Sequence, residues 1–167
     1  MDDFVIPFKG LSIGNHIFKF KIGDAFFKSF EYFENIGGKA VLDIDLLREP
    51  NMMILGFSIE GKLKLQCDRC LGFFSQGING KNQLIVKFGD KFVEESEDVI
   101  VIPQTESRID IRQYVFEYIC LSLPFRKVHP ADSKGNSGCN PEITNRIGTY
   151  SKRDADPRWD VLKDIKL

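Results

Sequence analysis

The chain has 167 residues, of which 43% are hydrophobic and 28% are charged, and its formal net charge is −1. That length allows one domain with a buried core, and the balanced charge excludes a strong overall field that would attract nucleic acid or a membrane surface. No apolar run approaches the ~20 residues needed to cross a bilayer, and the acidic N-terminus has no secretory signal. Four cysteines without such a signal indicate reduced thiols. We therefore expect a cytoplasmic protein with no membrane contact.

The N-terminal part predicts two strands and a helix. Residues 5–8 and 17–22 have strand character, and in the second segment apolar residues alternate with lysine. Gly14-Asn15 indicates a turn between them. Residues 25–35 predict a helix with a stripe of phenylalanines, which we interpret as core packing.

The central part predicts a β-meander. Apolar and polar residues alternate in five segments, which are residues 40–47, 53–59, 63–67, 73–78 and 83–88. Gly61 allows a bend between the second and third segments, and Asn79-Gly80 is a turn signal between the last two. Because sequential antiparallel strands normally pair with their neighbours, we expect one antiparallel sheet.

Beyond the meander, residues 89–98 are polar and acidic, so we expect an exposed loop there. Residues 99–102 predict a short strand that Pro103 ends. Residues 111–121 predict a helix with one apolar face turned inward, in which we interpret Cys120 as a core residue.

After Pro124 the composition changes. Residues 126–139 lack periodicity and read as loop, a short helix is expected from Pro141 to residue 147, and residues 148–155 form a link to a last helix opened by Asp156-Pro157. We expect residues 1–124 to form the core domain, with residues 125–167 as an irregular C-terminal segment packed on it in a single domain.

A metal site is suggested by Cys67 and Cys70, since a two-residue gap lets both thiolates reach one ion. Zinc takes about four ligands, and His129 and Cys139 are the donors available in the irregular segment. Spacing alone leaves open whether these four residues form a structural zinc site or are unrelated. The predicted fold is α+β: an antiparallel meandering β-sheet packed against two main helices, with a loop-rich C-terminal segment that closes the zinc knuckle.

The sequence offers little for catalysis. A thioredoxin-like redox motif opens a helix, whereas the residues after Cys70 have strand character. No glycine-rich phosphate loop is present. A zinc-dependent hydrolase is a weak alternative, because no general base accompanies the metal-ligand candidates. We therefore expect a protein that is not an enzyme.

Basic side chains concentrate near the Cys-x-x-Cys turn and in the tail. Residues 62–91 contain six basic and two acidic side chains, and residues 126–167 contain nine basic and six acidic ones. Residues 92–117, in contrast, contain two basic and seven acidic side chains. If the turn and the tail lie together, their basic side chains form a surface that attracts phosphate. The alternative is that the lysines on the polar faces of the strands only keep the sheet solvated. The predicted RNA contacts are Arg69, Lys62, Lys64, Lys152, Arg153 and Arg158.

Three motifs occur in order along the chain. They are Cys67-Asp68-Arg69-Cys70-Leu71, the run Leu121-Ser122-Leu123-Pro124, and Asp156-Pro157-Arg158 with Leu162-Lys163. The ordered set resembles the YceD-like family, bacterial and plastid proteins linked to accumulation of large-subunit ribosomal RNA. Many relatives carry several cysteines after the Leu-Pro motif, whereas this chain keeps only Cys139, which leaves a Cys₃His ligand set.

The resemblance implies a non-enzymatic factor in ribosomal RNA processing or accumulation, or in large-subunit assembly. Such a factor would bind large-subunit ribosomal RNA or its precursor, together with a ribosomal protein. The alternative is a protein–protein adaptor whose acidic loop, residues 94–98, meets a basic ribosomal protein.

Overall fold

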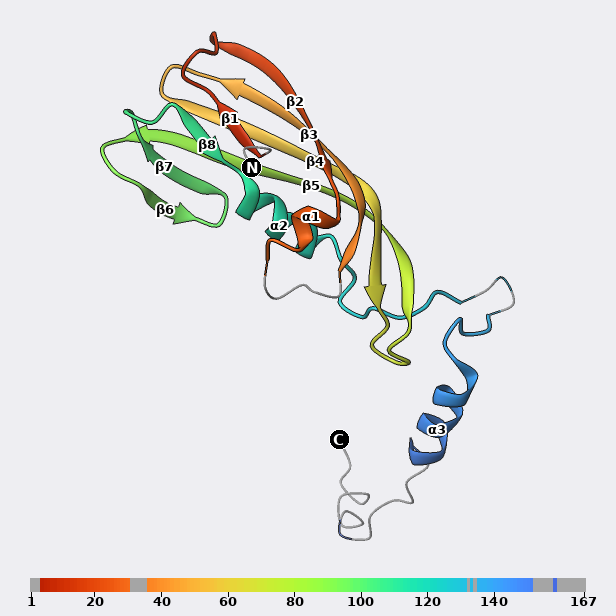
Figure 1. Ribbon diagram of the computed structural model, residues 1–167. Helices are drawn as coiled ribbons and strands as arrows, with labels where there is room; N and C mark the ends of the chain where they lie inside the picture. The colour runs from red at the N-terminus through yellow and green to blue at the C-terminus, as the bar shows by residue number, and fades with distance from the viewer. Residues whose placement is uncertain (1–3, 31–35, 132, 134, 152–157, 159–167) are drawn as a thin grey trace. The chain divides into compact units, whose positions relative to one another are not determined.

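The computed structural model describes residues 4–30, 36–131, 133, 135–151 and 158. A six-stranded sheet has the order β2-β3-β4-β5-β7-β6 (Figure 1). Its strands are β2 (Gly14–Ile22), β3 (Gly37–Arg48), β4 (Met52–Gln66), β5 (Phe73–Gly89), β6 (Val93–Ser96) and β7 (Val99–Pro103). A two-stranded sheet pairs β1 (Val5–Pro7) with β8 (Arg108–Asp110). The Gly14-Asn15 turn is therefore a wrong prediction, because both residues lie in β2.

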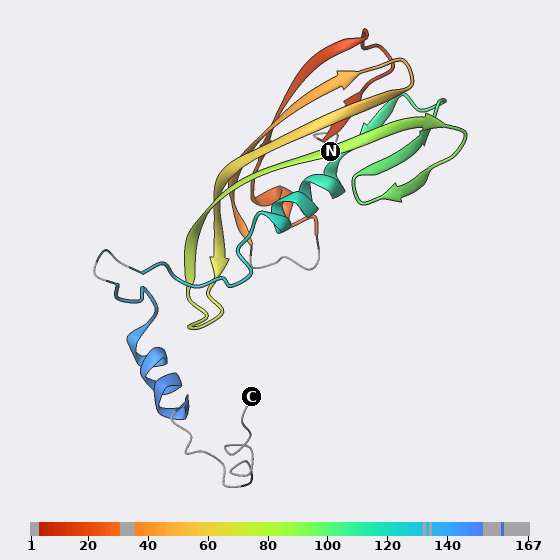
Figure 2. The ribbon, with the colours of Figure 1, turned by 180° about the vertical axis from the view of Figure 1, so that it is seen from behind.

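The large sheet is mixed, so the prediction of a purely antiparallel sheet is only partly right. β2 with β3, β3 with β4 and β6 with β7 are antiparallel, but β5 pairs with β7 in parallel, from Ile85 opposite Val99 to Gly89 opposite Pro103. After β5 the chain reverses into β6 at the end of the sheet and reverses again into β7 beside β5 (Figure 2). Two reversals leave β7 running in the direction of β5. The acidic segment predicted as a loop thus contains an edge strand.

β5 is one long strand, so the turn predicted at Asn79-Gly80 is wrong. The buried residues Phe74, Ile78, Leu84 and Val86 all have even numbers, so the same face is turned inward on both sides of Asn79-Gly80. A Cβ at Gly80 would lie 3.2 Å from Ser122 Cβ, so this glycine allows close approach at the end of α2.

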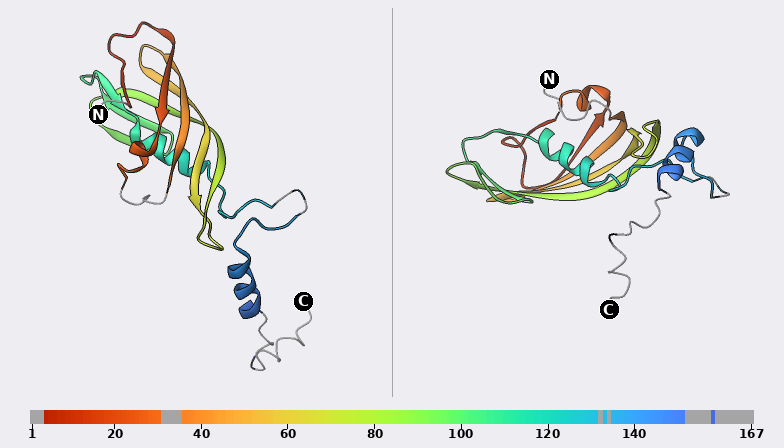
Figure 3. Two further views of the ribbon diagram at one scale, coloured as in Figure 1. Left: turned by 45° about the vertical axis from the view of Figure 1, so that its right-hand side comes forward. Right: turned by 90° about the horizontal axis from the view of Figure 1, so that it is seen from below.

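The core lies where the apolar face of the sheet meets the two helices α1 (Asp24–Phe27) and α2 (Arg112–Leu121), which lie on the same side of it (Figure 3). From α2, Val115, Tyr118 and Ile119 are buried as predicted. The Phe57 ring of β4 meets Tyr118 at 5.0 Å between centroids. Burying side chains of this size contributes about 1.5–3 kcal/mol each.

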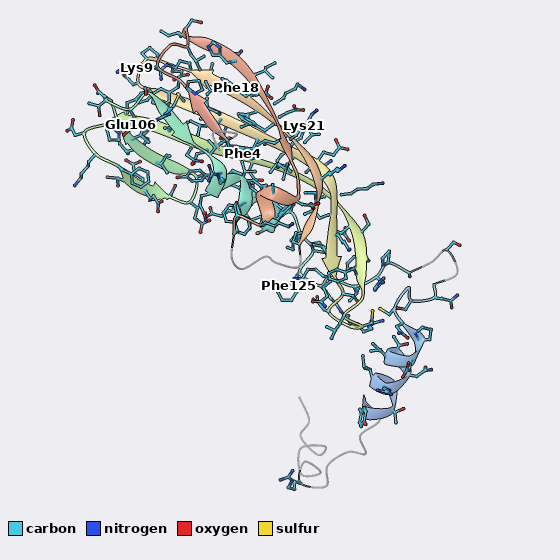
Figure 4. All side chains as sticks on the ribbon, in the orientation of Figure 1. Phe4, Lys9, Phe18, Lys21, Glu106 and Phe125 are labelled. Carbon is cyan, nitrogen blue, oxygen red and sulfur yellow. The ribbon has the colours of Figure 1, made fainter. Side chains whose placement is uncertain are left out.

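α1 is much shorter than the predicted helix over residues 25–35. Residues 28–30 form a turn, and residues 31–35 lie outside the described part of the chain. Aromatic contacts hold this part of the chain. Phe26 packs on Phe4, which Figure 4 labels, at 4.8 Å between ring centroids, and Phe30 stacks on Phe116 of α2 at 3.9 Å.

The chain divides into two compact units. We call Met1–Leu65 with Ser75–Phe125 the sheet unit, and Gln66–Phe74 with Arg126–Leu167 the turn–tail unit. Cys67 and Cys70 thus group with the tail.

The turn–tail unit contains α3 (Pro141–Ser151), which starts as predicted. The Glu142 backbone N–H donates to Asn140 Oδ1 at 2.9 Å, which caps the helix. α3 continues past its predicted end at residue 147, and Arg146 pairs with Glu142 one turn away at 3.1 Å. The helix predicted from Asp156-Pro157 lies almost wholly outside the described residues.

Candidate metal centre

The turn between β4 and β5 is built by local hydrogen bonds. The Leu71 N–H donates to the Cys67 carbonyl, and the Cys67 N–H donates to the Gly72 carbonyl, each at 2.9 Å. Leu71 takes the left-handed conformation with φ of 58°, which is uncommon for a leucine, and its side chain is exposed. This turn directs the thiols of Cys67 and Cys70 to the same side.

The irregular segment after α2 is attached to this turn. The Asp68 N–H donates to the Lys127 carbonyl, and the Lys127 N–H donates back to Asp68 Oδ2, each at 2.7 Å. Further along, an isolated bridge joins Ala131 to Ser137 and folds the segment back on itself. These contacts bring His129 and Cys139 to the two turn cysteines, which is one of the two arrangements that the spacing left open.

The four predicted ligand atoms form one cluster and all lie within 4.8 Å of one another. Cys67 Sγ is 3.7 Å from Cys139 Sγ, and His129 Nδ1 is 3.4 Å from Cys70 Sγ and 3.8 Å from Cys139 Sγ. Tetrahedral zinc bonds imply edges of about 3.8 Å between two sulfurs and about 3.6 Å between sulfur and nitrogen. The three separations given above are close to these edges, as a metal site requires.

The surroundings favour thiolate at Cys67. Burial opposes its ionisation, but hydrogen bonds from the Cys70 and Arg69 amides and from His129 outweigh burial and lower the pKa of Cys67 to about 6. The Arg69 amide lies 3.4 Å from Cys67 Sγ. Since the thiolate is the form that binds metals, these contacts prepare the site for an ion.

Small and aromatic residues that the sequence did not single out lie around His129 and complete the site. The Phe74 ring lies 5.1 Å from the imidazole, between centroids. A Cβ at Gly72 would be 3.4 Å from His129 Cε1, and one at Gly138 would be 3.0 Å from the Pro130 carbonyl. The sequence signal that could have indicated this packing is the position of Gly72 and Gly138 next to or near the cysteines Cys70 and Cys139.

Arg69 is oriented within the turn–tail unit. Its side chain is half-buried, and Nη1 donates to Ser137 Oγ at 3.4 Å. The same hydroxyl accepts from the Cys139 N–H at 3.3 Å. The guanidinium is thus linked to a residue that positions a metal-ligand candidate.

The other predicted RNA contacts are distributed over both units. Lys62 and Lys64 are exposed on β4 in the sheet unit. Arg158 is exposed in the turn–tail unit, and Lys152 and Arg153 lie outside the described residues. Cys120, predicted to be in the core, is only half-buried in α2.

Comparison with known proteins decides the family. A family model described as "Large ribosomal RNA subunit accumulation protein YceD" matches residues 55–166. The chain belongs to the YceD family. All four metal-ligand candidates and Arg69 lie in the matched range. No curated protein and no solved structure matches the chain. Within the part of the chain that the structure describes, no helix has the length and apolar character needed to span a membrane.

Proposed function

We propose that this protein is a non-enzymatic factor that supports accumulation of large-subunit ribosomal RNA by binding that RNA or its precursor. The family description names the accumulation of this RNA. The single observation that carries the binding proposal is the arrangement of the turn. Arg69 lies between two metal-ligand candidates in the sequence, its amide is 3.4 Å from Cys67 Sγ, and its guanidinium contacts Ser137.

Zinc is the metal that suits this donor set. Three thiols and one imidazole are soft and borderline ligands, and four of them fill a tetrahedron. A filled tetrahedron is the pattern of structural zinc, whereas catalytic zinc keeps an open position. The second histidine of the chain, His16, donates to the Ser12 carbonyl in the sheet unit. These features support a structural role for the ion.

The charge of the two units supports RNA binding by the turn–tail unit. Its sequence contains ten basic and seven acidic side chains, whereas the sheet unit contains thirteen basic and seventeen acidic ones. Three thiolates and a dication would together add one negative charge, which still leaves the turn–tail unit positive. A positive unit attracts phosphate and releases counterions on binding.

Arg69 suits the phosphate-binding role. A guanidinium carries five N–H donors in a planar fork that matches phosphate oxygens. One of its nitrogens contacts Ser137, and the side chain remains half-exposed. The turn would therefore present a pre-oriented donor group at little entropic cost.

Arg69→Ala tests this proposal, with Arg108→Ala as the matched control because Arg108 is exposed on β8 in the sheet unit. Affinity for fragments of large-subunit ribosomal RNA is measured by fluorescence anisotropy over a salt series. We expect Arg69→Ala to weaken binding and to lower the salt-dependence slope by about one, with an unchanged melting temperature. Equal affinities and slopes for both variants and the parent would count against RNA binding through this turn.

A further inference from the structure

The sheet unit carries a groove of about 1200 Å³ that the proposed RNA-binding role does not use. Its lining comes from α2, from β6 and the segments next to β6, and from the turn after α1, which contributes Ser29 and Phe30. We call it the α2–β6 groove. It lies entirely in the sheet unit, whereas the metal-ligand cluster belongs to the turn–tail unit.

The groove has aromatic surface. Phe30 and Phe116 stack with centroids 3.9 Å apart and planes inclined by 15°. Phe92 and Leu121, which also line the groove, are 55% and 73% exposed, so they add to its apolar surface. Exposed apolar side chains rimmed by polar ones mark interaction sites rather than ordinary monomer surface.

The charge of the groove is strongly negative. Among the lining residues that the structure describes, five are carboxylates and one, Arg112, is basic, and Arg112 lies 3.6 Å from the carboxylate of Asp110. The pKa of Tyr114 is raised, first by burial and then by the negative charges of Glu94 and Glu117, so the carboxylates of the groove act on this tyrosine. Phosphate groups would be repelled here, whereas lysine and arginine would be attracted.

Among the strands that the structure describes, β6 has one edge without a partner strand, and this edge borders the groove. β6 is the last strand of the sheet, its hydrogen-bonded neighbour is β7, and all four of its residues are exposed. Its pairing with β7 is irregular between Glu94 and Ser96. An edge of this kind offers backbone donors and acceptors to which an extended peptide can add as a further strand.

We propose that the α2–β6 groove binds an extended basic segment of a partner protein, which pairs with β6 and places lysine or arginine side chains over the aromatic residues. The aliphatic stems would cover Phe116 and Tyr114, and the charged heads would reach the carboxylates of Glu94 and Glu97. The aromatic surface, the negative rim and the open edge each fit this occupant, and together they disfavour RNA.

The probe is a fluorescein-labelled ten-residue peptide that alternates lysine or arginine with valine. The test variant is Glu94→Gln/Glu97→Gln, and the matched control is Asp45→Asn/Glu60→Gln, two exposed carboxylates on β3 and β4. We expect saturable peptide binding to the parent, at least about fivefold weaker binding to the groove variant, and a change of less than about twofold in the control. A peptide N-methylated at alternate residues should bind more weakly, because it cannot complete the strand pairing.

Several results would overturn the proposal: no saturable binding, equal weakening in both variants, equal binding of the N-methylated peptide, or displacement of the peptide by large-subunit RNA fragments. Arg69→Ala separates this site from the RNA-binding proposal. That variant should bind the peptide like the parent, whatever its affinity for RNA.

Discussion

Removal of one thiol tests the metal centre most directly. Cys139→Ser replaces a soft ligand that lies 3.7 Å from Cys67 Sγ with a hydroxyl, which binds zinc far less well. Cys120→Ser is the matched control, because Cys120 is half-buried in α2 and lies outside the cluster. We expect about one equivalent of zinc in the parent and the control, and less than about a tenth in Cys139→Ser.

The size of the effect follows from the chain that the ion ties together. Cys70 and His129 are 59 residues apart in sequence, and Cys67 and Cys139 are 72 apart. By analogy with a disulfide, a cross-link over loops of this length reduces the entropy of the unfolded chain by the equivalent of about 4 kcal/mol. Since each 1.4 kcal/mol is a factor of ten, opening of the turn–tail contacts should become up to about a thousandfold more frequent without metal.

Hydrogen exchange at single amides measures this opening. The reporters are the Lys127 amide, which donates to Asp68 at 2.7 Å, and the Gly138 amide, which donates to the Pro130 carbonyl. Both should lose protection in Cys139→Ser and after chelation of the parent, while amides of β3 and β4 keep theirs. Zinc-free parent protein, or equal exchange with and without chelator, would refute the metal centre as described.

Two further predictions concern the sheet unit. Gly61→Ala should lower the melting temperature by several degrees, because its Cβ would lie 2.5 Å from Ala40 on the facing strand. Gly77→Ala should leave the melting temperature unchanged, because a Cβ there would have nothing within 4 Å. Equal effects of the two substitutions would contradict this explanation. Tyr118 has a pKa raised to about 12, chiefly by burial and then by nearby carboxylates, so its contribution to stability is complete below pH 10 and is lost as pH rises through 12. Urea unfolding between pH 9 and 11.5 should show a smaller alkaline loss in Tyr118→Phe than in the parent; identical losses would refute the assignment.

Side-chain alternation made the strands and much of the core predictable. In β4 the buried residues from Met53 to Leu65 all have odd numbers, so one face of the strand is apolar along its whole length. The same periodicity continues through Gly61. The glycine is needed at this position because Ala40 lies directly opposite it. Local periodicity reports which face is buried, but not which neighbour lies against it.

The metal-ligand candidates were predictable because thiols at a two-residue spacing suit one ion whatever the surrounding fold. Their convergence with His129 and Cys139 depends on contacts such as the Asp68–Lys127 pair, which join segments far apart in sequence.

Contacts between distant segments also set three other features of the fold. These are the parallel pairing of β5 with β7, the edge position of β6 and the α2–β6 groove. The sequence by itself thus determined the buried faces and the ligand types, which are set by neighbouring residues. Only the tertiary structure decided the order of the strands and the sites they form, because strand order is set by packing between segments whose separation along the chain carries no local signal.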